Sequence, residues 1–297
     1  NMLFDADGKY IDTSDGSLWE WDDVGAYKAF TFSFSESCSV KPHTHTYSDG
    51  VCSECGYACP HNSGKNEREA SYFQKAICSV CHAEYGDCAK DTTAPSGEIK
   101  VKERTWWRSL LNKISFGLFF KENVSMTITA NDDSYSQPGF DKTKHAVKIE
   151  YLISNTAMSE EAVKASTFTE YSGAIDLSDE EQYVIYAKLT DHAENVAYAS
   201  TDGFEIDKTA PTIDGMKNGG VYYFCGGKTI TVTEKNIDKV TMDGNEISLD
   251  ENGQFTIPAD SEKHEIIVTD KAENETTVYI TVHPSPDFDK TTDTCLN

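Results

Sequence analysis

Seven of the nine cysteines of this chain lie between Cys38 and Cys88. Two runs in this region repeat one order: a Cys, a His and then a Cys-x-x-Cys. The candidate ligands are Cys38, His43 or His45, Cys52 and Cys55 in the first run, and Cys59, His61, Cys78 and Cys81 in the second. Four Cys and His ligands close a tetrahedral Zn²⁺ site. The sequence therefore predicts two structural zinc ions in residues 38–90, a segment too poor in aliphatic side chains to fold around a core of its own.

Disulfide bonds are the alternative use of these cysteines, because disulfides persist in extracellular proteins. The histidines at matching places favour metal, since a disulfide has no use for them. Two points stay open in the sequence: either His43 or His45 could be the ligand, and Cys88 is left over. A site closed by four protein ligands has no open position for water, so it is expected to hold structure and not to catalyse.

Charge and hydropathy exclude other classes of function. The 297 residues carry a net charge of −24, which disfavours binding to DNA or RNA despite the zinc-ligand pattern. No run of 18 apolar residues is present, so no membrane span is expected. Residues 1–37 alternate apolar and polar side chains, as in Ala29–Ser35, and are interpreted as a β remnant of an upstream domain. Residues 284–297 are interpreted as a linker or tail of a longer protein.

The rest of the chain contains an internal repeat. The motif Asp-x-Thr-Ala-Pro, called the opener, begins at Asp91 and again at Asp207. The motif Thr-Asp-x-Ala-Glu-Asn, called the closer, begins at Thr190 and again at Thr269. This order predicts two domains, residues 91–206 and 207–283. Both are rich in alternating β-branched segments: Met126–Ala130, Val147–Ile153, Tyr183–Leu189, Thr229–Thr233, Lys239–Met242, Glu265–Thr269 and Thr277–Val282. Many short strands separated by turns predict β-sandwiches, with a hairpin turn at Asp243–Asn245 and one short helix at Glu160–Lys164.

The openers and closers resemble those of bacterial Ig-like domains that tile large surface proteins of Gram-positive bacteria. The resemblance covers about two-thirds of the chain. Members of that family usually have Gly before the closing Asn, where this chain has Glu194 and Glu273. The Cys/His segment resembles short zinc-binding units of similar surface proteins. The resemblance implies an extracellular, modular and non-catalytic protein.

Several other residues were weighed as functional candidates. Asp191 and Asp270 of the closers could capture Ca²⁺, but each offers too few oxygens, so turns that cap their own backbone are expected. Trp106 and Trp107 could form a glycan platform, but burial in a core is expected. Cys225 is expected to be a lone buried thiol. Four isolated histidines are expected at the surface: His145, His192, His264 and His283.

The sequence thus predicts a mainly β protein of tandem Ig-like sandwiches with a small Cys/His metal-binding segment and an N-terminal β remnant. No catalytic motif is found, and the expected function is to space, present or adhere at a cell surface or cell wall. One alternative is a set of accessory modules of a large secreted enzyme, a glycoside hydrolase or protease, whose catalytic domain lies elsewhere. Another is a glycan-binding module. The partner is expected to be a host or cell-wall glycan or protein.

Overall fold

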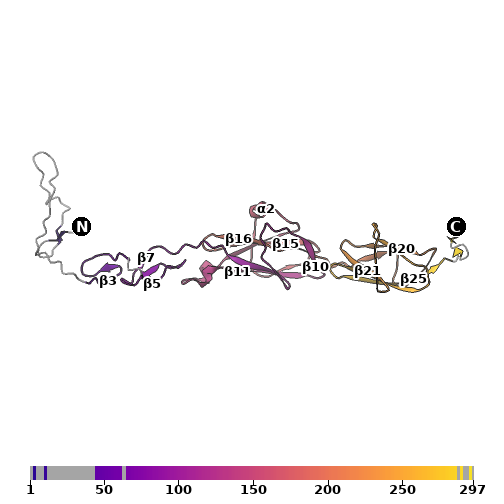
Figure 1. Cartoon of the computed structure of the whole chain (residues 1–297), viewed down its shortest axis with the longest axis horizontal. Helices are drawn as coiled ribbons and strands as arrows, with labels where there is room; N and C mark the ends of the chain where they lie inside the picture. Colours follow the sequence, from indigo (N-terminus) through magenta and orange to yellow (C-terminus); the bar gives the residue numbers. More distant parts are fainter. Residues whose placement is uncertain are drawn as a thin grey trace, which may run out of the picture. The chain divides into compact units, whose positions relative to one another are not determined.

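The computed structural model describes residues 44–61 and 65–285, together with the backbone of four short strands nearer the ends (Figure 1). These strands form two pairs, β1 (Leu3–Phe4) with β2 (Tyr10–Ile11) and β26 (Phe288–Asp289) with β27 (Thr294–Cys295). The chain divides into two compact units, residues 1–69 with 76–86 and residues 70–75 with 87–297. The expected strand at Ala29–Ser35 lies outside the described residues.

The Cys/His segment consists of small antiparallel hairpins and turns. One pair of strands precedes the first Cys-x-x-Cys turn, and a three-stranded sheet surrounds the second. The strands are β3 (Tyr47–Ser48), β4 (Val51–Cys52), β5 (Asn66–Arg68), β6 (Ala76–Cys78) and β7 (Glu84–Tyr85). Among its described residues, the buried hydrophobic cluster is made of Cys59, Cys78 and Cys81, and Ala76 is the one aliphatic residue that is also buried. The cysteines therefore occupy the place that a hydrophobic core takes in a larger domain.

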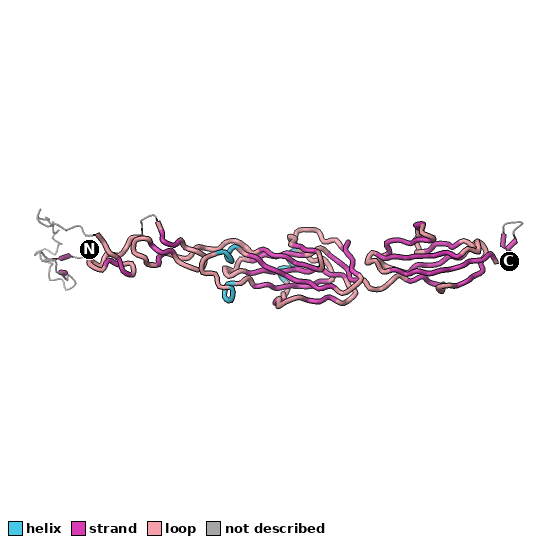
Figure 2. The backbone as a smooth tube through the Cα atoms, turned by 90° about the horizontal axis from the view of Figure 1, so that it is seen from below, coloured by secondary structure: helices cyan, strands magenta, loops and turns pink. Residues whose placement is uncertain are grey.

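Residues 96–206 form a two-sheet sandwich, seen as magenta strands in Figure 2. One sheet has the strand order β14-β11-β8-β9, and the other has β10-β17-β15-β12-β13, with β16 also pairing with β15. The bounds are β8 (Ser96–Val101), β9 (Arg104–Trp106), β10 (Phe116–Phe120), β11 (Val124–Asn131), η1 (Asp133–Ser136), α1 (Lys142–His145), β12 (Lys148–Ser154), α2 (Glu160–Ala165), β13 (Thr169–Glu170), β14 (Ile175–Leu177), β15 (Gln182–Thr190), β16 (Val196–Ser200) and β17 (Gly203–Ile206).

Strand β15 is buried on both of its faces. Tyr183, Ile185 and Ala187 point into the core between the sheets, whereas Val184 and Tyr186 pack with Val163 of α2 on the outer side. This double burial explains the unbroken apolar run that the strand shows in the sequence. Helix α2 begins where expected, because Ser159 Oγ accepts a hydrogen bond from the Ala162 backbone N–H.

The expected core role of the Trp106–Trp107 pair is confirmed. Both side chains are half-buried and pack against the core between the two sheets of the first sandwich. Burial of large aromatic rings contributes much of the apolar area that a small sandwich removes from water. The pair therefore stabilises this domain and offers no exposed aromatic platform.

Residues 212–284 form a second sandwich. Its sheets have the strand orders β18-β20-β23 and β19-β25-β24-β21-β22. The bounds are β18 (Thr212–Asp214), β19 (Gly220–Phe224), β20 (Lys228–Thr233), β21 (Ile237–Met242), β22 (Asn245–Ile247), β23 (Gln254–Ile257), β24 (Lys263–Asp270) and β25 (Glu275–Pro284). The predicted turn joins β21 to β22, with Asp243 at φ 53° and Gly244 at φ 78°.

Both sandwiches share one topological feature. An early strand pairs in parallel with the last strand, β10 with β17 in the first and β19 with β25 in the second, while the other pairs are antiparallel. The predicted fold class is confirmed: the described chain is mainly β and contains tandem Ig-like sandwiches. The repeat in the sequence therefore reflects a repeat in structure.

Each closer is an Asx turn, as expected, and it also fastens the opener of its own sandwich. Asp191 Oδ1 accepts hydrogen bonds from the backbone N–H groups of Ala193 and Asn195. Asn195 Nδ2 lies 3.4 Å from the carbonyl oxygen of Asp91. In the second sandwich, Asn274 Nδ2 donates to the carbonyl oxygen of Asp207 at 2.8 Å. The closing Asn thus ties the first residue of each repeat to its last hairpin.

The residue before each closing Asn has a left-handed backbone, with φ 65° at Glu194 and φ 66° at Glu273. A Cβ atom is unfavourable there, whereas glycine adopts this conformation without strain. We expect Glu273→Gly to raise the free energy of unfolding of the second sandwich by about 1 kcal/mol. Glu273→Ala keeps the Cβ and should change stability little. Equal effects of both substitutions in denaturant unfolding would contradict the strain argument.

His264 is a correction to the expectation of surface histidines. Its side chain is buried, with 6 % of the residue exposed. Nδ1 lies 2.7 Å from Asp243 Oδ2, and Nε2 lies 3.1 Å from Asp260 Oδ1. Burial lowers the pKa of His264, but the hydrogen bonds and charges of the two carboxylates outweigh it, so the pKa is raised overall. Two aspartates therefore hold this imidazole in its charged form.

This arrangement predicts a pH-dependent stability. Because the folded-state pKa of His264 is raised, its contribution is complete below about pH 6.5 and is lost as pH rises through the folded pKa. We expect the destabilisation caused by His264→Gln, measured by denaturant unfolding, to shrink between about pH 6 and pH 8. His283→Gln, at a histidine outside this pair of aspartates, is the control. A His264→Gln penalty that is constant with pH would show that the imidazole is neutral.

Candidate metal centre

Both Cys-x-x-Cys turns have the same backbone geometry. The residue after the second cysteine is left-handed in each, Gly56 at φ 70° and His82 at φ 57°. Its N–H donates to the carbonyl oxygen of the first cysteine, Cys52 or Cys78, at 2.9 Å in both turns. Such a turn brings two thiols to one side, where they can bind a single ion. The duplication seen in the sequence is therefore a duplication of local structure.

The second turn completes a group of four ligand atoms. Cys59, His61, Cys78 and Cys81 each offer one atom within 4.8 Å of the others. Cys59 Sγ lies 3.8 Å from Cys78 Sγ, and Cys81 Sγ lies 3.6 Å from His61 Nδ1. Tetrahedral Zn²⁺ with its usual bond lengths requires about 3.8 Å between two sulfurs and about 3.6 Å between sulfur and nitrogen. These two distances match edges of a zinc tetrahedron, and all four ligand atoms lie close enough to share one ion.

The same distances disfavour a disulfide in this group. The sulfurs of a disulfide lie about 2.05 Å apart, far closer than the pair Cys59–Cys78. Within residues 44–61 and 65–285, no disulfide is found among the cysteines of the two ligand groups, which are Cys52, Cys55, Cys59, Cys78 and Cys81. Cys88 is an exposed thiol that belongs to neither group. The geometry therefore fits metal ligation better than cross-linking by oxidation.

The electrostatics of the second group favour a thiolate. A hydrogen bond with His61, followed by backbone N–H donors that include Val80, lowers the pKa of Cys78 to about 6. The Val80 nitrogen lies 3.4 Å from Cys78 Sγ. Burial raises the pKa of Cys81, which is the opposite effect. The ring of His61 is fixed by stacking on Tyr85 at 4.4 Å, so its Nδ1 faces the sulfurs.

The first group is described for three of its predicted ligands. His45, Cys52 and Cys55 offer atoms within 4.8 Å of one another. His45 Nδ1 lies 3.4 Å from Cys55 Sγ, and its ring stacks on Tyr57 at 5.0 Å. The other predicted ligands, Cys38 and His43, lie outside the described residues. The structure thus brings His45 of the histidine pair to the Cys-x-x-Cys turn.

A third group of ligand atoms was only partly predicted from the sequence. Asp91, Asp132 and Asp191 bring carboxylate oxygens within 4.8 Å of one another. Asp191 was recognised as a closer and Asp91 as an opener, but Asp132 belongs to no repeated motif. Only the pairing of β11 with β8 places it beside the opener. A signal of this kind depends on long-range strand register, which a single sequence does not reveal.

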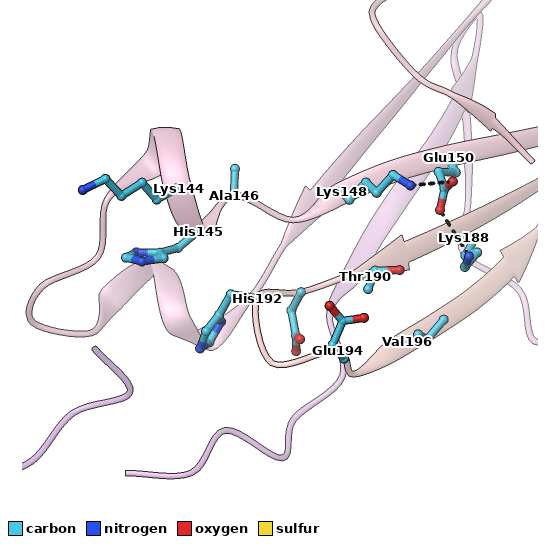
Figure 3. Close-up of a pocket in the computed structure, with 11 residues that line it drawn as sticks. Lys144, His145, Ala146, Lys148, Glu150, Lys188, Thr190, His192, Glu194 and Val196 are labelled. Carbon is cyan, nitrogen blue, oxygen red and sulfur yellow. Dashed lines mark hydrogen bonds and ion pairs between the residues drawn. The ribbon is translucent and has the colours of Figure 1, made fainter. Parts of the chain in front are cut away.

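A cavity of about 590 Å³ lies at the same end of the first sandwich (Figure 3). Glu150 is buried there between Lys148, at 2.8 Å, and Lys188, at 3.3 Å. The hydrogen bond from Lys148 lowers the pKa of Glu150 despite its burial. His145 and His192 line another part of the cavity. Glu150 thus forms ion pairs with both lysines. Because these three charges are paired with one another, they fit a structural role better than a catalytic one.

No family model matches the chain, and no curated protein matches it. Among solved structures, the fibronectin(III)-like modules of Clostridium thermocellum CbhA are 14 % identical, with 63 % of this chain and 95 % of that chain covered and a TM-score of 0.26. SGBP-B of Bacteroides ovatus, in complex with a mixed-linkage heptasaccharide, is 12 % identical over 64 % of this chain and 48 % of that chain, with a TM-score of 0.25. The N-terminal eight Ig domains of Down Syndrome Cell Adhesion Molecule are 8 % identical over 64 % and 25 %, with a TM-score of 0.33. Likenesses of this degree carry no argument about function.

Helices are short throughout the described part of the chain, and none of them has the length and apolar character to span a membrane.

We expect the purified, reduced protein to bind about two equivalents of Zn²⁺, since each Cys-x-x-Cys turn anchors its own ligand group. Cys59→Ser should remove about one equivalent and leave the other ion bound, because the two ligand groups share no residue. Metal analysis by mass spectrometry checks both values. Cys88→Ser, at a free exposed thiol outside both groups, is the matched control and should keep both ions. Zinc near zero with the ligand thiols oxidised would contradict the metal assignment.

Proposed function

We propose that this chain is a non-catalytic, modular segment of an extracellular surface protein, which spaces, presents or adheres. The observation that carries the proposal is the duplicated clamp between opener and closer. It joins Asn195 to Asp91 and Asn274 to Asp207, so each repeat closes on itself. Domains that close individually can be strung in series without a shared core. A serial array of this kind suits a spacer better than an enzyme, whose site needs converging residues.

Cysteine chemistry supports an extracellular location. Cys225 is exposed and disulfide-bonded, which corrects the expectation of a lone buried thiol. Disulfides persist in oxidising compartments and are rare in the cytosol. Thiols held by zinc are protected from oxidation as long as the metal is bound, so the two uses of cysteine are compatible in one chain. Attachment to a Gram-positive cell wall remains an expectation from the resemblance of the repeats.

The Cys/His segment is proposed to be a zinc-stabilised spacer ahead of the sandwiches. Each zinc ion would be held by four protein ligands: Cys38, His45, Cys52 and Cys55 in the first site, and Cys59, His61, Cys78 and Cys81 in the second. Four protein ligands leave no position for a substrate or an activated water. The ions would replace the hydrophobic core that this segment lacks.

A glycan-binding module and accessory modules of a secreted glycoside hydrolase or protease are the other candidates. Aromatic rings in a row would favour the first. Among the described residues, the large exposed hydrophobic side chains are scattered along the chain: Val51, Tyr57, Val80, Leu111, Val196, Val221 and Tyr223. Only Tyr57 and Tyr223 of these are aromatic, and they belong to different compact units. The spacer role is therefore preferred, with host or cell-wall glycan or protein as the candidate partner.

The boundary between residues 91–206 and 207–283 is proposed to separate two independently folding domains. A protein comprising residues 207–285 contains all eight strands of the second sandwich and its core. We expect it to unfold cooperatively and to give dispersed amide signals by NMR. A molten spectrum of this fragment would argue that the unit needs its neighbour and would count against a serial spacer.

The whole chain is expected to show no turnover of glycan or peptide substrates in glycosidase and protease assays, because the proposed zinc sites are closed by four protein ligands. Chelation should unfold the Cys/His segment and leave the unfolding transitions of the sandwiches in place, because zinc binding there is folding free energy. Saturable glycan binding that is lost in Tyr223→Ala would favour the glycan-binding module. An activity abolished by chelator would show that one zinc keeps an open position.

A further inference from the structure

The first sandwich contains three buried carboxylates that lie close to one another. Asp91, Asp132 and Asp191 are 5 %, 6 % and 5 % exposed, and their ligand oxygens lie within 4.8 Å of one another. Asp91 comes from the opener, Asp132 follows β11, and Asp191 follows β15. Three segments far apart in the sequence therefore place their carboxylate groups close together. Like charges at such a distance repel strongly when they are shielded from water.

Two of the carboxylates have an oxygen that accepts no hydrogen bond from the described residues. Asp91 Oδ2 and Asp132 Oδ2 are buried and accept no hydrogen bond within the described part of the chain. The other oxygens are used locally: Asp91 Oδ1 accepts from the Thr93 N–H, and Asp132 Oδ1 accepts from the Ser134 N–H. These bonds fix the orientation of both side chains and leave Oδ2 over. A buried unpaired carboxylate oxygen is costly, so such atoms point to a missing ligand.

Asp191 completes the arrangement from the closer. Its Oδ1 accepts from two backbone N–H groups, and its Oδ2 accepts from Asn195 Nδ2 at 2.9 Å. A carboxylate has about four acceptor positions, so one remains for a cation. The nearest basic side chain is His192, whose Nδ1 lies 3.6 Å from Asp91 Oδ2 and makes no hydrogen bond. Even a protonated His192 would balance only one of the three charges.

The second sandwich provides an internal comparison. Glu234 is the counterpart of Asp132 by strand register. Asn131, just before Asp132, pairs with Ser96, just after the opener proline. In the same way Thr233, just before Glu234, pairs with Thr212. Asp207 and Asp270 correspond to Asp91 and Asp191 in the repeat. In this sandwich the Asn236 side-chain amide donates to Asp207 Oδ2 at 3.2 Å. None of these three counterparts has a buried carboxylate oxygen without a hydrogen bond. The opener carboxylate of the second sandwich thus accepts a hydrogen bond from a side-chain amide. In the first sandwich, Asp91 Oδ2 and Asp132 Oδ2 accept no such bond from the described residues.

We propose that Asp91, Asp132 and Asp191 bind one Ca²⁺ ion. The donors are all oxygens, which hard cations prefer, and Cys and His ligands of the zinc type are absent from the group. Two oxygens on one Ca²⁺ ion lie at most about 4.8 Å apart, twice the Ca–O distance, and the three aspartates meet this limit. Water or backbone carbonyls complete the six to eight ligands that Ca²⁺ takes. Mg²⁺ is disfavoured because it binds few carboxylates and keeps its waters.

The surroundings allow the ion to enter. Asp191 and His192 line the cavity of about 590 Å³, which gives an ion a path to the carboxylate of the closer (Figure 3). Charges of both signs line this cavity, and Glu150 is already paired with Lys148 and Lys188. Bound Ca²⁺ would join the opener to the segment after β11 and to the closer, so it would stiffen the entry into the first sandwich. This consequence is independent of zinc, because the two kinds of site share no ligand.

The test is a titration of the full zinc-loaded chain with CaCl₂, followed by ¹H–¹⁵N NMR and thermal unfolding. We expect saturable shifts at the amides that donate to the three carboxylates, Thr93, Ser134, Ala193 and Asn195. Affinity is expected in the range of extracellular calcium modules, with a dissociation constant on the order of 10⁻⁴ M. Ca²⁺ at about ten times this constant should raise the folded-to-unfolded ratio of the first sandwich about elevenfold. MgCl₂ at equal ionic strength is the control for screening.

Two variants separate a calcium site from a structural turn. Asp132→Asn keeps the acceptor for the Ser134 N–H and removes one charge. It should weaken Ca²⁺ binding at least tenfold, yet leave the calcium-free protein as stable as the wild type or more so, because a repulsive charge is gone. Glu234→Gln, the counterpart in the second sandwich, should leave Ca²⁺ binding unchanged. Asp91→Asn repeats the test should Asp132→Asn fold poorly.

Three results would overturn the proposal. The first is the absence of a saturable calcium response in the wild type, or an equal response to Mg²⁺. The second is unchanged calcium binding in both Asp132→Asn and Asp91→Asn. The third is an equal loss of binding in Glu234→Gln, which would reveal a general effect of acidic charge.

Discussion

The carboxylate of the closer is the interaction on which each sandwich depends. The Asp191 carboxylate stabilises the turn between β15 and β16, and the Asp270 carboxylate stabilises the turn between β24 and β25. Each carboxylate also accepts a hydrogen bond from the Asn side chain that reaches the opener. Without this bond, the first strand of the repeat would have to find its place through side-chain packing alone. A buried, charge-assisted hydrogen bond is stronger and more directional than packing contacts. The motif therefore links the beginning of each sandwich to its closing turn.

Local signals in the sequence were sufficient for the elements that depend on neighbouring residues. The Asp243-Gly244 turn and the Ser159 cap of α2 both follow from residues a few positions apart. Non-local features were not accessible in the same way. The parallel pairing of β10 with β17 joins segments separated by the whole domain. His264 looks isolated in the sequence, because one of its two carboxylates is 21 residues away.

The candidate sites divide along the same line. The Cys/His groups were visible because their ligands come in short, repeated spacings that metal geometry imposes. The aspartate group was only partly visible, because its members are delivered by the opener, by the end of β11 and by the closer. Asp132 has no sequence neighbour that marks it as special, and the structure singles it out by its burial and its unpartnered oxygen. Long-range register thus creates a site that no spacing rule describes.

The two kinds of site also differ in what they replace. In the Cys/His segment the buried cluster consists of cysteines, so these side chains and the zinc proposed to bind them would take the place of a hydrophobic core. The first sandwich already has a core of aliphatic and aromatic side chains and folds around it. A cation among its aspartates would add no core; it would offset a repulsion that the fold has built in. Under these proposals, zinc would be required for the Cys/His segment to fold, whereas calcium would adjust the stiffness of the first sandwich, which has a core of its own. The net charge of −24 favours expansion by self-repulsion, and bound cations would oppose it.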